Sequence, residues 1–114
     1  MAKIRRIATE EAFSIPEVAQ ALRQVARGPS SSLDKLLVKG IYDAQPGASG
    51  YGSMNFLDGL IDIEDRRLKE MDALGVDMHL LSLTAPGVQM FDADTATELP
   101  ALANDRLCKP PVVP

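Results

Sequence analysis

Residues Val76–Leu83 form a nearly continuous apolar segment, and this segment limits the possible folds more than any other part of the sequence. A strand that is apolar on both faces is typical of a parallel sheet covered by helices. A shorter apolar and basic segment, Ile4–Glu10, predicts a second strand near the N-terminus. Parallel strands need a long connection, which is usually helical and right-handed. The sequence therefore predicts an α/β fold in which helices join two parallel strands.

Helix signals follow the first strand. Ser14 and Glu17 have the spacing of a capping box, and Gly28 with Pro29 predicts the end of the helix that they begin. A second, short helix is expected after the serines at 30–32, with a stop at Gly40. Its apolar face is predicted to consist of Leu33, Leu36 and Leu37.

The clearest helix pattern spans Asp62–Leu74. Its aspartates suit the positive N-terminal end, and Gly75 follows at the position where a left-handed stop is favoured. The charged run over residues 64–70 predicts a solvated face, on which Asp65 and Lys69 form an i,i+4 pair. The apolar side is expected to consist of Ile61, Leu68, Met71 and Leu74.

The chain after the second strand predicts a sharp break at residues 84–87, Thr-Ala-Pro-Gly, and then a last helix. Asp92 or Asp94 can cap this helix, and its apolar positions are Leu99, Leu102 and Leu107. Pro100 either kinks the helix or delays its start, because a proline inside a helix costs about 3 kcal/mol.

A loop rich in glycine and small polar residues is predicted over residues 42–53, with Tyr42 and Tyr51 at its two ends. Loops of this length are either binding loops or disordered segments. Each tyrosine either covers a ligand or packs the loop onto the protein surface. Both alternatives stay open at this point.

Composition excludes several classes of protein. A length of 114 residues suits one small domain, and a net charge of −4 argues against a nucleic-acid partner. The sequence has no apolar run long enough to predict a membrane span. Its single cysteine, Cys108, rules out an intrachain disulfide and suits a reducing compartment. We therefore expect a cytoplasmic protein.

The acidic pair Glu10–Glu11 comes where the first predicted strand ends. Side chains two apart on a strand share a face, so Glu10 is expected to lie with Ala8 and Ala12, and Glu11 on the opposite face. A carboxylate that faces inward would be an unpaired buried charge unless a cation or a donor met it. Glu10 is therefore the candidate metal ligand.

Four blocks of the sequence, in this order, resemble the amidohydrolase-related decarboxylases: Ile7–Phe13, Arg67–Leu68 with Met71–Asp77, Leu81–Gln89 and Ala103–Leu107. These enzymes are metal-dependent (β/α)8 barrels, and they include γ-resorcylate and 5-carboxyvanillate decarboxylases. The resemblance implies an incomplete TIM barrel that contains its first two parallel strands with their helices. Residues 1–114 are thus interpreted as the N-terminal portion of one barrel domain, with a tail at 108–114 that departs from the family.

The resemblance also implies a metal site. Many members carry Glu-x-His after the first strand. Glu10 matches this glutamate, whereas Ala12 stands at the histidine position, as in the 5-carboxyvanillate type. The remaining ligands, a histidine and an aspartate on later strands, have no counterpart in this sequence. The parent enzyme is expected to bind zinc or manganese, and the 114 residues to contain no catalytic residue and to be inactive alone.

Substrate contacts are implied in the same way. The parent would take a small aromatic carboxylic acid, act on neither nucleic acid nor membrane, and form a homo-oligomer. Thr84, at the end of the second strand, either holds the substrate carboxylate or caps the turn before Pro86, and Tyr42 is the other substrate-binding candidate. Met78, Leu80 and Ser82 are expected to face the barrel interior, and His79 to face the helices in a structural role.

Two other functions remain open. The superfamily also contains enzymes that hydrolyse C–N and C–O bonds, so the parent could be a hydrolase. The chain could instead be a non-catalytic binding module. Residues that would distinguish these alternatives from a decarboxylase do not occur in the 114 residues.

Overall fold

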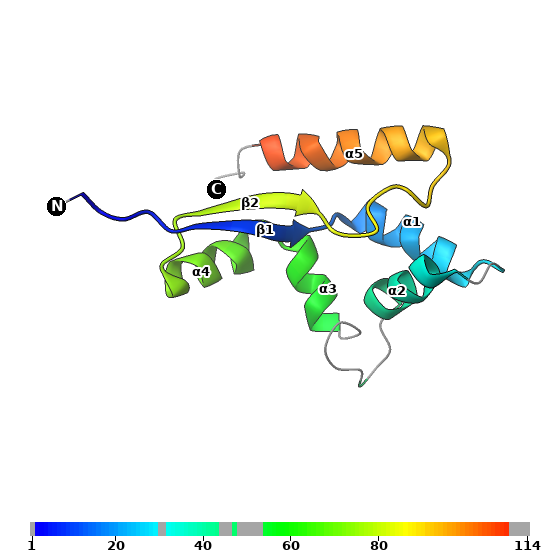
Figure 1. Cartoon of the computed structure of the whole chain (residues 1–114), viewed down its shortest axis with the longest axis horizontal. Helices are drawn as coiled ribbons and strands as arrows, with labels where there is room; N and C mark the ends of the chain where they lie inside the picture. Colours follow the sequence, from blue (N-terminus) through cyan, green and yellow to red (C-terminus); the bar gives the residue numbers. More distant parts are fainter. Residues whose placement is uncertain (1, 30–31, 44–46, 48–53, 110–114) are drawn as a thin grey trace.

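The computed structural model describes residues 2–29, 32–43, 47 and 54–109. Figure 1 shows two strands at the centre, with helices along both sides. In chain order the elements are β1 (Ile7–Phe13), α1 (Pro16–Arg27), α2 (Leu33–Tyr42), α3 (Met54–Ile61), α4 (Asp65–Leu74), β2 (Met78–Leu83) and α5 (Ala93–Cys108). No helix among the described residues is both long enough and apolar enough to cross a membrane.

The two strands pair in parallel, which confirms the predicted α/β arrangement. Ile7 lies opposite Met78 at one end and Phe13 opposite Leu83 at the other. Both strands begin later than expected, and β1 continues past the predicted end at Glu10 to Phe13. Before the strands, the Arg6 carbonyl accepts the N–H groups of Asp77 (2.9 Å) and Met78 (3.3 Å). The Arg6 N–H also donates to the Asp77 carboxylate at 2.9 Å. These hydrogen bonds join the two chain segments just before the strands pair.

A bulge interrupts β1 between Ala8 and Glu11. Ala8 pairs with His79, but Glu11 pairs with Leu81, so β1 carries one more residue than β2 over this interval. An extra residue exchanges the faces of the residues that follow it. The expectation that Ala8 and Ala12 share a face is therefore wrong, whereas Glu11 lies on the face of His79, as predicted.

The two faces of β2 differ in exposure. His79, Leu81 and Leu83 are half-buried, and Leu81 and Leu83 pack against the core. The opposite face is exposed at Met78 and Leu80, and Ile7 of β1 is exposed as well. This division agrees with the predicted faces, in which His79 is directed toward the helices. The open face leaves an apolar surface on the described part of the sheet.

The core lies between α1, α2, α3 and the end of β1. Its fully buried members include Val18 and Leu22 of α1 and Val38 of α2, and Ala103 of α5 also belongs to it. The predicted apolar face of α2 is wrong. Its three leucines are exposed, by 83% at Leu33, 67% at Leu36 and 46% at Leu37.

The second helix instead packs through Val38, Ile41 and Tyr42. It continues past Gly40, and its last carbonyl, that of Tyr42, accepts a hydrogen bond from Arg23 Nε of α1 at 2.6 Å. The N-terminus of α2 agrees with the prediction, because the Ser32 hydroxyl accepts the Lys35 N–H. The side of α2 that faces the core is thus formed by Val38, Ile41 and Tyr42 and not by the predicted leucines.

A helix that the sequence patterns did not predict, α3, precedes α4. Leu57 and Leu60 of α3 are buried, and the Leu60 carbonyl accepts the Ser14 N–H at 2.9 Å. Ser14 is buried and does not cap α1, whose N-cap is Ile15. Most of the predicted loop at 42–53, including Tyr51, lies outside the described residues.

The fourth helix begins at Asp65 and not at Asp62. The Asp62 carboxylate accepts the N–H groups of Glu64 and Arg66, each at 3.2 Å, and so caps α4 from outside it. Gly75 ends the helix in the predicted left-handed conformation, with a φ of 67°. Much of the predicted apolar side is exposed, including Leu74.

The last helix runs along the opposite side of the sheet from α3 and α4 in Figure 1. Asp92 is its N-cap and accepts the Thr95 N–H at 3.0 Å. Pro100 lies within α5 and does not end it. Arg106 of α5 pairs with Glu17 of α1, and this contact connects the last helix to the first.

Candidate functional site around the β1 bulge

The C-terminal ends of both strands lie together, where a parallel α/β sheet places its ligand site. The Thr84 N–H donates to the Phe13 carbonyl at 2.9 Å and joins the chain after β2 to the end of β1. The Thr84 carbonyl accepts the Gly87 N–H at 2.9 Å and so closes a turn. Thr84 is half-buried, and its predicted contact with substrate stays a prediction.

Glu10 lies in the bulge with a φ of 62° and is the only non-glycine residue of the described ranges with a positive φ. Such a left-handed conformation costs an L-residue about 1–2 kcal/mol. The prediction that its side chain is buried is wrong, because Glu10 is exposed. Strained residues of this kind cluster at functional sites. Its role as a metal ligand stays a prediction.

A cavity of about 390 Å³ lies beside the bulge, between β1 and helices α3 and α4. Charged side chains of both signs border it, together with one histidine: Glu10, Glu11, Glu70, Arg66, Arg67 and His79. The His79 Nδ1 atom is buried and makes no hydrogen bond within the described part of the chain. The described residues contain no group of three or more histidine, cysteine or acidic side chains placed to hold a metal ion.

Arg67 contradicts the prediction that residues 64–70 only form a solvated face. Its side chain is 11% exposed. Its Nη2 donates to the Ala12 carbonyl at 2.8 Å and to the Gly59 carbonyl at 3.2 Å, while Nη1 lies 4.0 Å from Glu11 Oε2. One guanidinium thus connects three elements: β1, α3 and α4.

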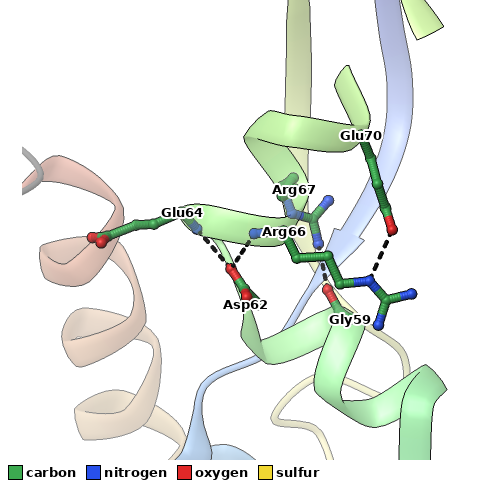
Figure 2. A network of polar contacts seen from close by, with 6 residues as sticks. All are labelled: Gly59, Asp62, Glu64, Arg66, Arg67 and Glu70. Carbon is green, nitrogen blue, oxygen red and sulfur yellow. Dashed lines mark hydrogen bonds and ion pairs between the residues drawn. The ribbon is translucent and has the colours of Figure 1, made fainter. Parts of the chain in front are cut away.

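Figure 2 shows that the side chains of Arg66 and Arg67 reach different partners. The Arg67 guanidinium reaches Gly59 on α3, whereas Arg66 Nε pairs with Glu70 Oε1 at 2.8 Å along the exposed side of α4. Sequence reasoning missed Arg67. The spacing of Arg67 and Met71, one helical turn apart, was the available signal that Arg67 faces inward.

Tyr42 lies elsewhere. It is fully buried and borders a different cavity of about 660 Å³, which Arg23, Arg27 and Asp43 also line. Burial raises the pKa of the Tyr42 phenol, and the neighbouring Ser14 hydroxyl offsets part of this rise. The structure therefore brings Glu10 and His79 to one cavity and places Tyr42 at another.

No protein-family model matches the chain. Over 51 residues it is 49% identical to the γ-resorcylate decarboxylase of Rhizobium radiobacter, and the match covers 44% of this chain and 16% of that enzyme. The sequence comparison alone thus relates less than half of the chain to a decarboxylase.

Solved structures extend the similarity. The 5-carboxyvanillate decarboxylase from Sphingomonas paucimobilis matches with a TM-score of 0.77 and 48% identity, over 91% of this chain and 30% of that chain. The 5-carboxyvanillate decarboxylase from Novosphingobium aromaticivorans matches with a TM-score of 0.78 and 38% identity, over 90% and 29% respectively. That structure contains manganese and 4-hydroxy-3-methoxy-5-nitrobenzoic acid.

These comparisons confirm the resemblance predicted from the four sequence blocks. The chain spans about 30% of the length of these two solved structures, so the similarity relates it to a fragment of each.

Proposed function

We propose that this chain, which is similar over nine-tenths of its length to a fragment of 5-carboxyvanillate decarboxylase, forms part of a metal-dependent carboxy-lyase barrel. The substrate class is a small aromatic acid of the hydroxybenzoate type, and the reaction is loss of its carboxyl group as carbon dioxide. The observation that carries this proposal is the structural match at 48% identity.

The open face of the sheet supports the proposal. Ile7, Met78 and Leu80 are large apolar residues, between 42% and 53% exposed, on adjoining strands. Contiguous exposed apolar surface marks a site of contact with further protein. In a barrel this face would be covered by side chains from the other strands.

Glu10 is the residue through which this chain would hold the metal. Its side chain is exposed at the bulge inside β1, where its carboxylate would accept a divalent cation such as manganese or zinc. Protein sites for such ions need three or more protein ligands, and the described residues offer no group of that size. The further ligands would therefore come from outside the described residues. When bound, the metal would orient the acid and stabilise developing negative charge.

The other candidate residues, Thr84, Tyr42 and His79, would contact the substrate or support the site. Thr84 stands at the end of β2, where its hydroxyl could donate to a substrate carboxylate. Tyr42 is the weaker of the two predicted substrate contacts, because its buried ring borders the other cavity. His79 lines the cavity beside Glu10 on the helix-facing side of the sheet, and this position supports a structural role.

A chimera tests the proposal. Residues 7–107 would replace the corresponding segment of the 5-carboxyvanillate decarboxylase from Sphingomonas paucimobilis, the structure with 48% identity. We expect the chimera to release carbon dioxide from 5-carboxyvanillate, and the 114-residue chain alone to release none. A chimera that folds and binds manganese but only hydrolyses C–N or C–O bonds, or has no activity, would contradict a decarboxylase role.

A further inference from the structure

We infer that Arg67 is a positioning residue, which holds the β1 bulge in the shape that presents Glu10. This inference rests on the proposed role of Glu10 as a metal ligand. It assigns a role to an arginine that belongs to one of the four family-like blocks and that the proposed chemistry does not otherwise use.

Strand pairing alone does not set the conformation of the bulge. Regular pairing holds β1 before the bulge at Ala8 and after it at Glu11, but the extra residue between them is outside the regular ladder. Glu10 nevertheless adopts a φ of 62°, which its Cβ atom disfavours. A strained residue persists only where the surrounding structure determines its geometry. Contacts outside the ladder must therefore fix the chain here.

Arg67 supplies those contacts. Its Nη2 binds the carbonyl of Ala12, two residues after Glu10, and its Nη1 lies near the carboxylate of Glu11. The same Nη2 binds the carbonyl of Gly59, near the end of α3. The guanidinium thus fixes the chain just after the bulge to a helix that belongs to the core.

The guanidinium group of arginine has the donors that these three contacts need. Its planar group carries several N–H donors in a rigid arrangement, so one side chain can serve two carbonyls and a carboxylate together. A lysine would keep the positive charge but would lose the fixed geometry of these donors. The adjacent Arg66 pairs with Glu70 on the exposed side of α4 and provides a matched control.

The test uses NMR spectroscopy of the full 114-residue chain without metal. The backbone chemical shifts and the HN–Hα coupling of Glu10 report whether its φ is left-handed or extended. Hydrogen exchange at the Thr84 N–H, which binds the Phe13 carbonyl, reports whether the strand ends still pair. The proteins compared are the wild type, Arg67→Gln, Arg67→Lys and the control Arg66→Gln.

We expect both Arg67 variants to lose the left-handed signature at Glu10 while the Thr84 N–H stays protected, and Arg66→Gln to keep both. The inference is overturned if Glu10 is extended in the wild type, or if it stays left-handed in the two Arg67 variants. It is also overturned if both variants lose protection at Thr84, since Arg67 would then stabilise the fold generally.

The readout needs neither metal nor substrate, so it separates this inference from the proposed function. Carbon dioxide release by the chimera tests the function alone. If Glu10 depends on Arg67 and the chimera is inactive, the proposed function fails while the conformational role of Arg67 stands. In an active chimera, Arg67→Lys is expected to lower manganese affinity more than Arg66→Gln does.

Discussion

Replacing Ile41 by alanine is expected to destabilise the protein far more than replacing Leu36, although both residues lie on α2. Ile41 is 8% exposed and belongs to the core, so Ile41→Ala removes buried atoms and leaves a cavity. Losses of this kind cost about 2–5 kcal/mol in the free energy of unfolding. We expect a value near the middle of that range, about 3 kcal/mol.

Leu36 is 67% exposed, so only about a third of its side chain leaves water on folding. Complete burial of a leucine is worth about 1.5–3 kcal/mol, which limits the contribution of Leu36 to about 0.5–1 kcal/mol. Alanine also has the higher helix propensity, which offsets part of the loss. The two substitutions should therefore differ by more than about 2 kcal/mol.

Urea unfolding of the full chain, followed by circular dichroism, measures both free energies. The slopes of the two transitions should agree, because a difference in slope would signal a change in the unfolded or folded ensemble and not in stability alone. Equal losses, or a larger loss for Leu36→Ala, would show that α2 packs through its leucines. The assignment of the core to Val38, Ile41 and Tyr42 would then be wrong.

Two further predictions concern a charge pair and two glycines. Arg106 holds the pKa of the Glu17 carboxyl below its ordinary value of 4.5, so the pair stabilises the fold above that pH and the contribution disappears as pH falls through the lowered pKa. Between pH 7 and pH 3 the free energy of unfolding of the wild type should fall by about 0.5 kcal/mol more than that of Glu17→Gln, as measured by urea unfolding. The difference is small because the pair is partly exposed. An equal fall in the two proteins, or an equal effect of the exposed control Glu98→Gln, would contradict this role. Gly75→Ala should destabilise the protein by about 1 kcal/mol, because Gly75 has a φ of 67°. Gly40→Ala should stabilise it by about 0.5–1 kcal/mol, because Gly40 lies in a helix with open space around it. Thermal unfolding that ranks the two variants in the opposite order would refute the assigned backbone conformations.

The parallel pairing, the ends of α1 and α4, the starts of α2 and α5 and the two faces of β2 follow from local patterns. Apolar segments, Gly75 and the Asp92 N-cap act through neighbouring residues, so sequence reasoning can identify them. The packing face of α2 could not be predicted in the same way. This helix carries apolar residues on two sides, and the unpredicted α3 supplies Leu57 and Leu60 to the core that α2 joins.

The β1 bulge and Arg67 were harder to predict for a related reason. Among residues 7–13 no glycine or asparagine marks a left-handed position. Arg67 lies in a run of charges, and nothing local indicates that the carbonyls of Ala12 and Gly59 will meet it. Contacts between residues distant in sequence determined both features.

Manganese binding by the chimera tests most directly whether Glu10 supplies the metal ligand of this chain. The bound metal would be measured in the chimera, in its Glu10→Gln variant and in a Glu11→Gln control, because the bulge places these neighbouring glutamates differently. We predict that Glu10→Gln loses bound manganese and that Glu11→Gln retains it. Retention of manganese by Glu10→Gln, or its loss only in Glu11→Gln, would contradict the assignment.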